Sequence, residues 1–129
     1  MSEKFTVEII TPESSILKLD TSEVLIPSYE GYMGILKDHI PLITFLRPGI
    51  ISIKNPEEKK YFVEEGTVEF SNNNLLILTS TAKDLKNFDK NSINNLLEDA
   101  EKKLKNTNFS DKEKYIISYK IDTLKEINQ

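Results

Sequence analysis

The sequence predicts a fold in which β-structure precedes α-structure: an N-terminal antiparallel β-sandwich of about ten strands at residues 1–87, then a C-terminal antiparallel two-helix hairpin at residues 88–129. One observation is that all four glycines and all five prolines lie within the first 66 residues. Turn-forming residues between short apolar runs are typical of successive strands, whereas a long segment without them permits helices. The other observation is that the apolar period changes near Phe88 from two residues to three and four.

Short apolar runs in the first part predict the strands. Phe5, Val7 and Ile9 alternate with polar residues, which is the pattern of a half-buried strand. The further runs lie at 16–19, 24–26, 32–36, 42–46, 50–53, 61–63, 68–70 and 75–78. Because no helical pattern interrupts these runs, they favour an antiparallel sandwich or a flattened barrel.

The turn residues predict how some of these strands are joined. Arg47-Pro48-Gly49 predicts a tight reversal in which Gly49 has a positive φ. Pro56 predicts a turn at 55–58, so that 50–53 and 61–63 form a hairpin. The three asparagines at 72–74 tolerate left-handed backbone geometry and predict a second hairpin.

Two helices are predicted after residue 88. Asp89 is a suitable N-cap for the first, and Ser110 with Glu113 forms a capping box for the second. Each helix is about 16 residues and roughly 24 Å long. The apolar stripe of the second helix is formed by Ile117, Ile121 and Leu124.

Composition excludes several classes of function. The 129 residues contain no cysteine, one histidine and one arginine, which leaves no thiolate chemistry and little for transition metals. The net charge of −4 is unfavourable for binding nucleic acid. No apolar run approaches the roughly 20 residues needed to cross a bilayer. We therefore expect no metal, no nucleic acid and no membrane-spanning segment.

One segment carries a more specific pattern. It reads GYMGILKDHIPL from Gly31 and ends in LRPG at 46–49. The succession of G-x-x-G-x-L, H-x-P and L-x-P-G at this spacing resembles the signature of the epsilon subunit of F-type ATP synthases, called delta in mitochondria. A T-P-E turn at 11–13, a V-x-x-P strand at 24–27 and a G-x-V-E element at 66–69 extend the resemblance to nearly the whole chain.

The resemblance implies a non-catalytic rotor subunit of the central stalk of a proton-translocating ATP synthase. Such a subunit couples the gamma subunit to the ring of c subunits, and its contact with the membrane is only through the complex. Its helices can leave the sandwich, extend along gamma towards the alpha and beta subunits, and hinder ATP hydrolysis. We expect a peripheral location on the cytoplasmic face of the bacterial inner membrane.

The resemblance also names candidate interface and switch residues. The candidate interface with the c ring and gamma lies around the signature and comprises Tyr29, Gly31, Tyr32, Met33, Gly34, Asp38 and His39. The candidate switch face is the stripe of Ile117, Ile121 and Leu124, which needs two alternative places of burial. A stripe packed permanently on the first helix is the alternative.

No cofactor is expected. Some members of the family bind ATP through a D-x-x-R-A motif in the helical part, and Asp89 is the only match here. Ser92 and Ile93 occupy the arginine and alanine places, so we expect no ATP binding at physiological concentration.

Two other classes of function remain open from the sequence. One is a free-standing β-sandwich recognition module whose helical hairpin serves oligomerisation. The other is a hydrolase using His39 beside Asp38, which the absence of a G-x-S-x-G motif and of a second histidine disfavours.

Overall fold

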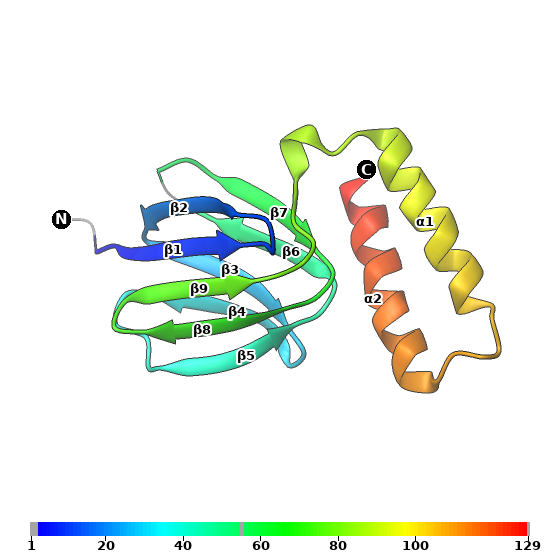
Figure 1. The fold of residues 1–129 in the computed structure, drawn as a ribbon, viewed down its shortest axis with the longest axis horizontal. Coiled ribbons are helices and arrows are strands. Elements are labelled where there is room, and N and C mark those ends of the chain that lie inside the picture. The colour runs from blue at the N-terminus through cyan, green and yellow to red at the C-terminus, as the bar shows by residue number, and fades with distance from the viewer. Residues whose placement is uncertain (1–2, 55, 129) are drawn as a thin grey trace.

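A computed structural model describes residues 3–54 and 56–128, and it confirms the predicted order of a β-sandwich followed by two helices (Figure 1). The helices are α1 (Lys90–Leu104) and α2 (Asp111–Ile127), preceded by a short 3-10 helix, η1 (Leu85–Asn87). The ten strands are β1 (Phe5–Ile10), β2 (Ser15–Thr21), β3 (Glu23–Ser28), β4 (Gly31–Leu36), β5 (Leu42–Leu46), β6 (Gly49–Ile53), β7 (Lys59–Val63), β8 (Gly66–Ser71), β9 (Asn74–Leu78) and β10 (Lys83–Asp84).

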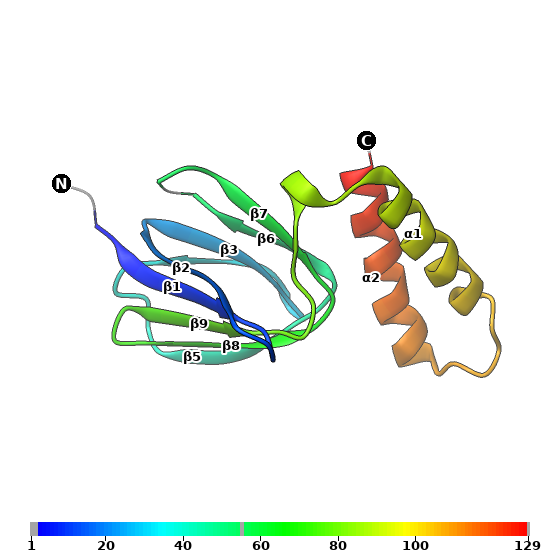
Figure 2. The same cartoon turned by 45° about the horizontal axis from the view of Figure 1, so that its top comes forward.

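All the strands belong to one hydrogen-bonded sheet, in the order β10-β7-β6-β3-β5-β8-β9-β1-β2, with β4 paired to β3. The sheet folds over so that β6 and β7 face β8 and β9 in the opposite layer (Figure 2). The antiparallel pairing is confirmed with one exception, because β1 and β9 run parallel.

Alternating side chains fill the space between the layers. Phe5, Val7 and Ile9 point inwards from β1 and are buried, as their period of two predicts. The rings of Phe5 and Phe70 meet edge to face with their centroids 5.6 Å apart. The sandwich therefore has one continuous apolar core.

Both predicted hairpins are present. β6 pairs with β7 and β8 pairs with β9, and Asn72 and Asn73 adopt φ of 51° and 58° between the latter two. Asn55, part of the predicted turn at 55–58, lies outside the described residues.

The predicted reversal at Arg47-Pro48-Gly49 is wrong in its geometry. β5 and β6 each pair with β3, so this corner carries the chain past the end of β3. In the described part of the chain, Gly31 and Gly66 are the glycines with positive φ, and Gly49 is not. Gly49 is needed for a different reason: an added Cβ would lie 2.5 Å from Cβ of Pro27.

The helix starts are formed as predicted. The backbone N–H of Ser92 donates to the Asp89 carboxylate at 2.7 Å. At α2 the Glu113 N–H donates to Oγ of Ser110 at 3.1 Å, and the Ser110 N–H donates to the Glu113 carboxylate at 3.0 Å. These bonds satisfy donors that the first turn of a helix leaves unpaired.

The hairpin packs on the end of the sandwich from which the chain continues to η1 and α1 (Figure 1). Phe62 of β7 is buried with Ile93 of α1 and Leu124 of α2. The Phe62 ring also stacks on Phe88, with centroids 5.7 Å apart and an interplanar angle of 24°. A side chain of the sandwich thus completes the apolar cluster of the helices.

Substitution of Gly49 by alanine should destabilise the sandwich, since the new methyl group would meet the rigid ring of Pro27. We expect a loss of about 1 to 3 kcal/mol in the free energy of unfolding, measured in urea. Gly34→Ala is the matched control, because its Cβ would have its nearest neighbour at 3.5 Å. Equal stabilities of the two variants would contradict this role of Gly49.

The hairpin should also lose stability in acid. Hydrogen bonds from Ser92 lower the pKa of Asp89, and hydrogen bonds from Ser110 lower the pKa of Glu113. A carboxyl with a lowered folded-state pKa stabilises the fold above its unfolded pKa, and this contribution disappears as the pH falls through the folded pKa. Helical circular dichroism should therefore fall less steeply below about pH 4 in Asp89→Asn/Glu113→Gln, because both amides can still accept the capping bonds. An unchanged pH profile would refute this assignment.

Candidate functional site

The predicted interface residues lie at two opposite ends of the sandwich. Tyr29 lies in the β3–β4 turn and Gly31 and Tyr32 begin β4, whereas Asp38 and His39 follow the other end of β4. The β3–β4 turn is at the end of the sandwich that faces the helices (Figure 1). The six residues of β4 separate the two groups by about 17 to 20 Å. The structure therefore divides the predicted interface residues between two separate surfaces.

Strand β4 places its residues on alternating faces. Tyr29 and Tyr32 are about half exposed, and Met33 packs against the core. Gly31 adopts a φ of 118° at the turn, a conformation that favours glycine. Gly34 lies within the strand, opposite Leu25 of β3.

At the far end, Asp38 joins two loops. It adopts a φ of 66°, its N–H donates to Oδ1 of Asn73 at 2.7 Å, and its carboxylate accepts from Nδ2 of Asn73 at 2.9 Å. The ring of His39 lies edge to face against Phe70, and its Nδ1 faces the carbonyl oxygen of Ile40 at 2.8 Å. Asp38 and His39 thus have separate structural partners and do not form the acid–base pair of a hydrolase.

A third surface was missed by the sequence reasoning. On β5, Ile43 is 70% exposed and Phe45 is 59% exposed, while Leu42 packs on the core and Leu46 is buried. The missed signal was that 42–46 carries apolar residues on both faces of the strand: Leu42 and Leu46 on one, Ile43 and Phe45 on the other. One face of this sheet layer meets water. We call the exposed residues Tyr29, Ile43, Phe45 and Leu78 the apolar β5 face.

The members of this face are linked by register and by a shallow groove. Phe45 lies opposite Thr67 of β8, and Thr67 lies opposite Leu78 of β9. A groove of about 520 Å³ joins Tyr29 and Phe45 to Lys112 at the start of α2. The surface therefore extends from β9 across β5 to the β3–β4 turn.

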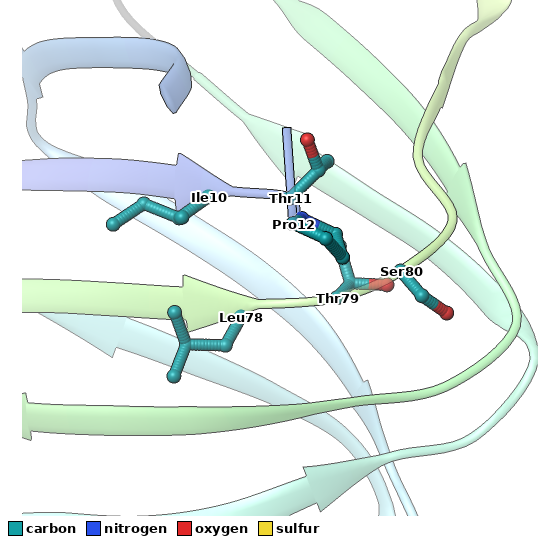
Figure 3. Close-up of a pocket in the computed structure, with 6 residues that line it drawn as sticks. All are labelled: Ile10, Thr11, Pro12, Leu78, Thr79 and Ser80. Atoms are coloured by element: carbon teal, nitrogen blue, oxygen red, sulfur yellow. The ribbon is translucent and has the colours of Figure 1, made fainter. Parts of the chain in front are cut away.

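A second shallow pocket, of about 340 Å³, lies at the ends of β1 and β9 (Figure 3). Ile10 and Leu78 are paired in register and lie side by side there. Its remaining lining residues are Thr11, Pro12, Thr79 and Ser80. With no titratable group in its lining, this pocket extends the apolar surface and offers no acid–base chemistry.

The only arginine of the chain connects the sandwich to α2. Arg47 is 8% exposed, and its guanidinium carbon lies 5.1 Å from the ring centroid of Tyr32 and 4.0 Å from that of Tyr119. Its Nη1 donates to the carbonyl oxygen of Pro48 at 2.8 Å. Beside it, the Lys120 ammonium and the Glu64 carboxylate are 2.7 Å apart. Cation–π and ionic contacts therefore hold the middle of α2 against the sandwich.

The candidate switch face is turned inwards in this structure. Ile121 and Leu124 are buried and Ile117 is half-buried. The hairpin is thus observed in the docked arrangement, with the apolar stripe of α2 covered.

The residues at the places of the ATP motif serve the fold. The Asp89 carboxylate caps α1, and Ile93 is buried against Phe62. Within residues 3–54 and 56–128, no three histidine, aspartate or glutamate side chains are close enough together to hold a metal ion. Neither helix in the described part of the chain is long and apolar enough to cross a membrane.

The comparisons with known proteins agree with one another. Residues 4–84 match the family described as ATP synthase, Delta/Epsilon chain, beta-sandwich domain. The ATP synthase epsilon chain of Pelagibacter ubique is 52% identical over 130 residues, covering 99% of this chain and all of that protein. The epsilon chain of Myxococcus xanthus is 30% identical, covering 84% of this chain and 80% of its own length.

The fold is shared more widely. A chain in the mitochondrial ATP synthase structure from Euglena gracilis, which contains OSCP, F1 and the c-ring, superimposes with a TM-score of 0.75 at 19% identity. The match covers 97% of this chain and 79% of that one. By family match and by full-length identity, the chain belongs to the delta/epsilon family of ATP synthase subunits.

Proposed function

We propose that this chain works mechanically, as the rotor subunit that couples gamma to the c ring. The observation that carries the proposal is the apolar β5 face on a rigid sandwich. Contiguous apolar side chains on a soluble protein mark a surface that another protein covers. Family membership identifies that protein as part of an ATP synthase, in which epsilon subunits are not the catalytic ones.

A coupling subunit needs two separate surfaces, and the sandwich offers them at different places. The apolar β5 face, with Tyr32 beside it, suits a permanent partner, because obligate interfaces are the more apolar ones. We assign it to gamma. The loop carrying Asp38 and His39, which also exposes Leu36 and Ile40, is assigned to the c ring. The Asp38–Asn73 bonds stiffen this loop, so that torque can pass through it.

The two parts of the chain would then have different tasks. The sandwich, residues 1–87, forms the coupling body, and the hairpin, residues 88–129, is the regulatory part. Extension of the hairpin along gamma would expose Ile117, Ile121 and Leu124 to the alpha and beta subunits and hinder hydrolysis. Burying each side chain completely contributes about 1.5 to 3 kcal/mol, so an alternative partner could compete with the docked state.

We further place the subunit on the cytoplasmic face of a bacterial inner membrane, as part of the ATP synthase. The epsilon chains of Pelagibacter ubique and Myxococcus xanthus support a bacterial setting. No observation favours the alternative of a free-standing recognition module.

The assignment of the apolar β5 face to gamma can be tested by introducing a charged side chain. Phe45→Asp should weaken the complex with gamma at least about tenfold, since an exposed apolar contact is replaced by a desolvated carboxylate. Ile16→Asp is the matched control, because Ile16 is an exposed apolar strand residue outside this face. Co-purification at equal stoichiometry and titration calorimetry measure the effect. Equal affinities for gamma in both variants would refute the assignment.

The regulatory role can be tested by truncation. Removal of residues 89–129 should raise ATP hydrolysis by the assembled enzyme, because the inhibitory segment is gone. ATP synthesis and the stoichiometry of the complex serve as controls for assembly. Unchanged hydrolysis in a fully assembled complex would show that the hairpin does not inhibit.

A further inference from the structure

The layer of the sandwich that carries the apolar β5 face has an uneven distribution of charge. Four neighbouring strands form this part of the layer, in the order β5-β8-β9-β1. They contain two charged residues, Glu69 in β8 and Glu8 in β1, and neither lysine nor arginine. A protein that covers these strands therefore meets an apolar surface whose charges are both negative.

Glu69 stands between apolar side chains of the two neighbouring strands. In register it lies opposite Ile43 of β5 on one side and opposite Leu76 of β9 on the other. Residues directly opposite each other on one face of a sheet have their Cβ atoms only about 4.5 to 5.5 Å apart. The Glu69 side chain is exposed, as is that of Ile43. Any protein that covers Ile43 and Leu76 consequently covers the Glu69 carboxylate as well.

The two glutamates differ in the partners that their own chain supplies. The Glu8 carboxylate accepts from Oγ of Ser15 at 2.7 Å, and Lys18 of β2 lies opposite Glu8 in register. Among residues 3–54 and 56–128, no side chain or backbone group forms a hydrogen bond or an ion pair with the Glu69 carboxylate. Water alone solvates this carboxylate in the free chain, and a covering protein would remove that water.

A shallow groove beside Glu69 indicates which kind of side chain can take the place of the water. The groove has a volume of about 430 Å³ and lies along the pair of β5 and β8. Its lining residues are Pro41, Leu42, Ile43, Glu69, Phe70 and Ser71. Lysine and arginine bury their apolar stems along apolar surface while the charged head reaches a polar group. Apolar walls with one carboxylate among them therefore match a long cationic side chain.

The cost of desolvation makes such a partner necessary. A carboxylate that is buried without a counter-charge is strongly unfavourable, whereas a close charge pair across an interface is tolerated or favourable. Apolar contacts are not directional, so Ile43 and Phe45 supply area without fixing which surface is accepted. A charge that has to be met at one point does fix it.

We propose that Glu69 gives this face its selectivity by forming an ion pair with a lysine or arginine of gamma, whose apolar stem lies in the groove at Pro41 and Ile43. The inference rests on the proposed function, because gamma is the partner assigned to the apolar β5 face. It goes beyond that assignment in stating that the surface of gamma is basic opposite Glu69. A surface that is equally apolar but lacks this cation would be rejected.

Replacement of Glu69 by leucine distinguishes a paired carboxylate from an unpaired one. If the covered carboxylate had no partner, leucine would remove its desolvation cost, add an apolar contact and tighten binding. If the ion pair exists, leucine leaves a cation of gamma buried and unpaired. We expect the Kd for gamma to rise at least about tenfold in Glu69→Leu, mainly through faster dissociation. Glu69→Lys should weaken binding further, because two cations would then face each other.

Titration calorimetry and dissociation rates with purified gamma measure these effects, and circular dichroism verifies the fold of each variant. Glu101→Leu is the matched control, since it removes an exposed glutamate from α1, outside this face. Its affinity for gamma should equal that of the unchanged chain.

Binding of Glu69→Leu to gamma that is as tight as that of the unchanged chain, or tighter, would overturn the proposal. Phe45→Asp, measured in the same series, separates the two levels of the argument. If Phe45→Asp weakens binding and Glu69→Leu does not, the ion pair alone is refuted. If neither substitution weakens binding, the assignment of gamma to this face is refuted as well.

Discussion

The close approach of Gly49 to Pro27 is the contact on which the architecture depends. It lets the chain leave β5, pass the end of β3 and start β6, so that the two layers close around one core. The same corner places Arg47 between Tyr32 and Tyr119. A side chain larger than hydrogen at position 49 would move the corner, and with it the residue that holds α2. The closure of the sandwich and the docking of the hairpin therefore share one steric condition.

Local patterns were sufficient to predict both α-helices and nine of the ten described strands, whereas the two-residue β10 has no apolar run of its own. The alternation at Phe5, Val7 and Ile9 and the capping box at Ser110 depend on residues close in sequence, so the strand and the helix start could be inferred directly. The parallel pairing of β1 with β9 could not, because it joins segments almost 70 residues apart. The tight reversal at Gly49 was predicted from turn statistics, yet the reason for the glycine is contact with a distant proline.

The interface was harder to predict than the fold for a related reason. A run such as 42–46 is apolar whether a strand is covered on one face or on both, and only the topology shows that Ile43 and Phe45 meet solvent. The signature around Gly31 to His39 located the correct region of the chain. It could not show that β4 separates its two ends by the length of the sandwich. No local sequence pattern marked Arg47 as a contact residue, because its partners come from β4 and α2.

A mechanical role makes two opposed demands on such a chain. The coupling body has to be stiff, and the Asp38–Asn73 bonds and the edge-to-face contact of the Phe5 and Phe70 rings supply stiffness at the far end. If the hairpin regulates as proposed, it has to detach without loosening that body. Apolar packing throughout the docked face would make release more costly, because every buried apolar side chain would have to be exposed to water. Placing polar contacts at the cleft lined by Pro48 and Ile117, and confining close packing to the cluster at Phe62, separates the two demands. Under the proposed function, this arrangement would let the hairpin detach while the strands of the sandwich stay paired.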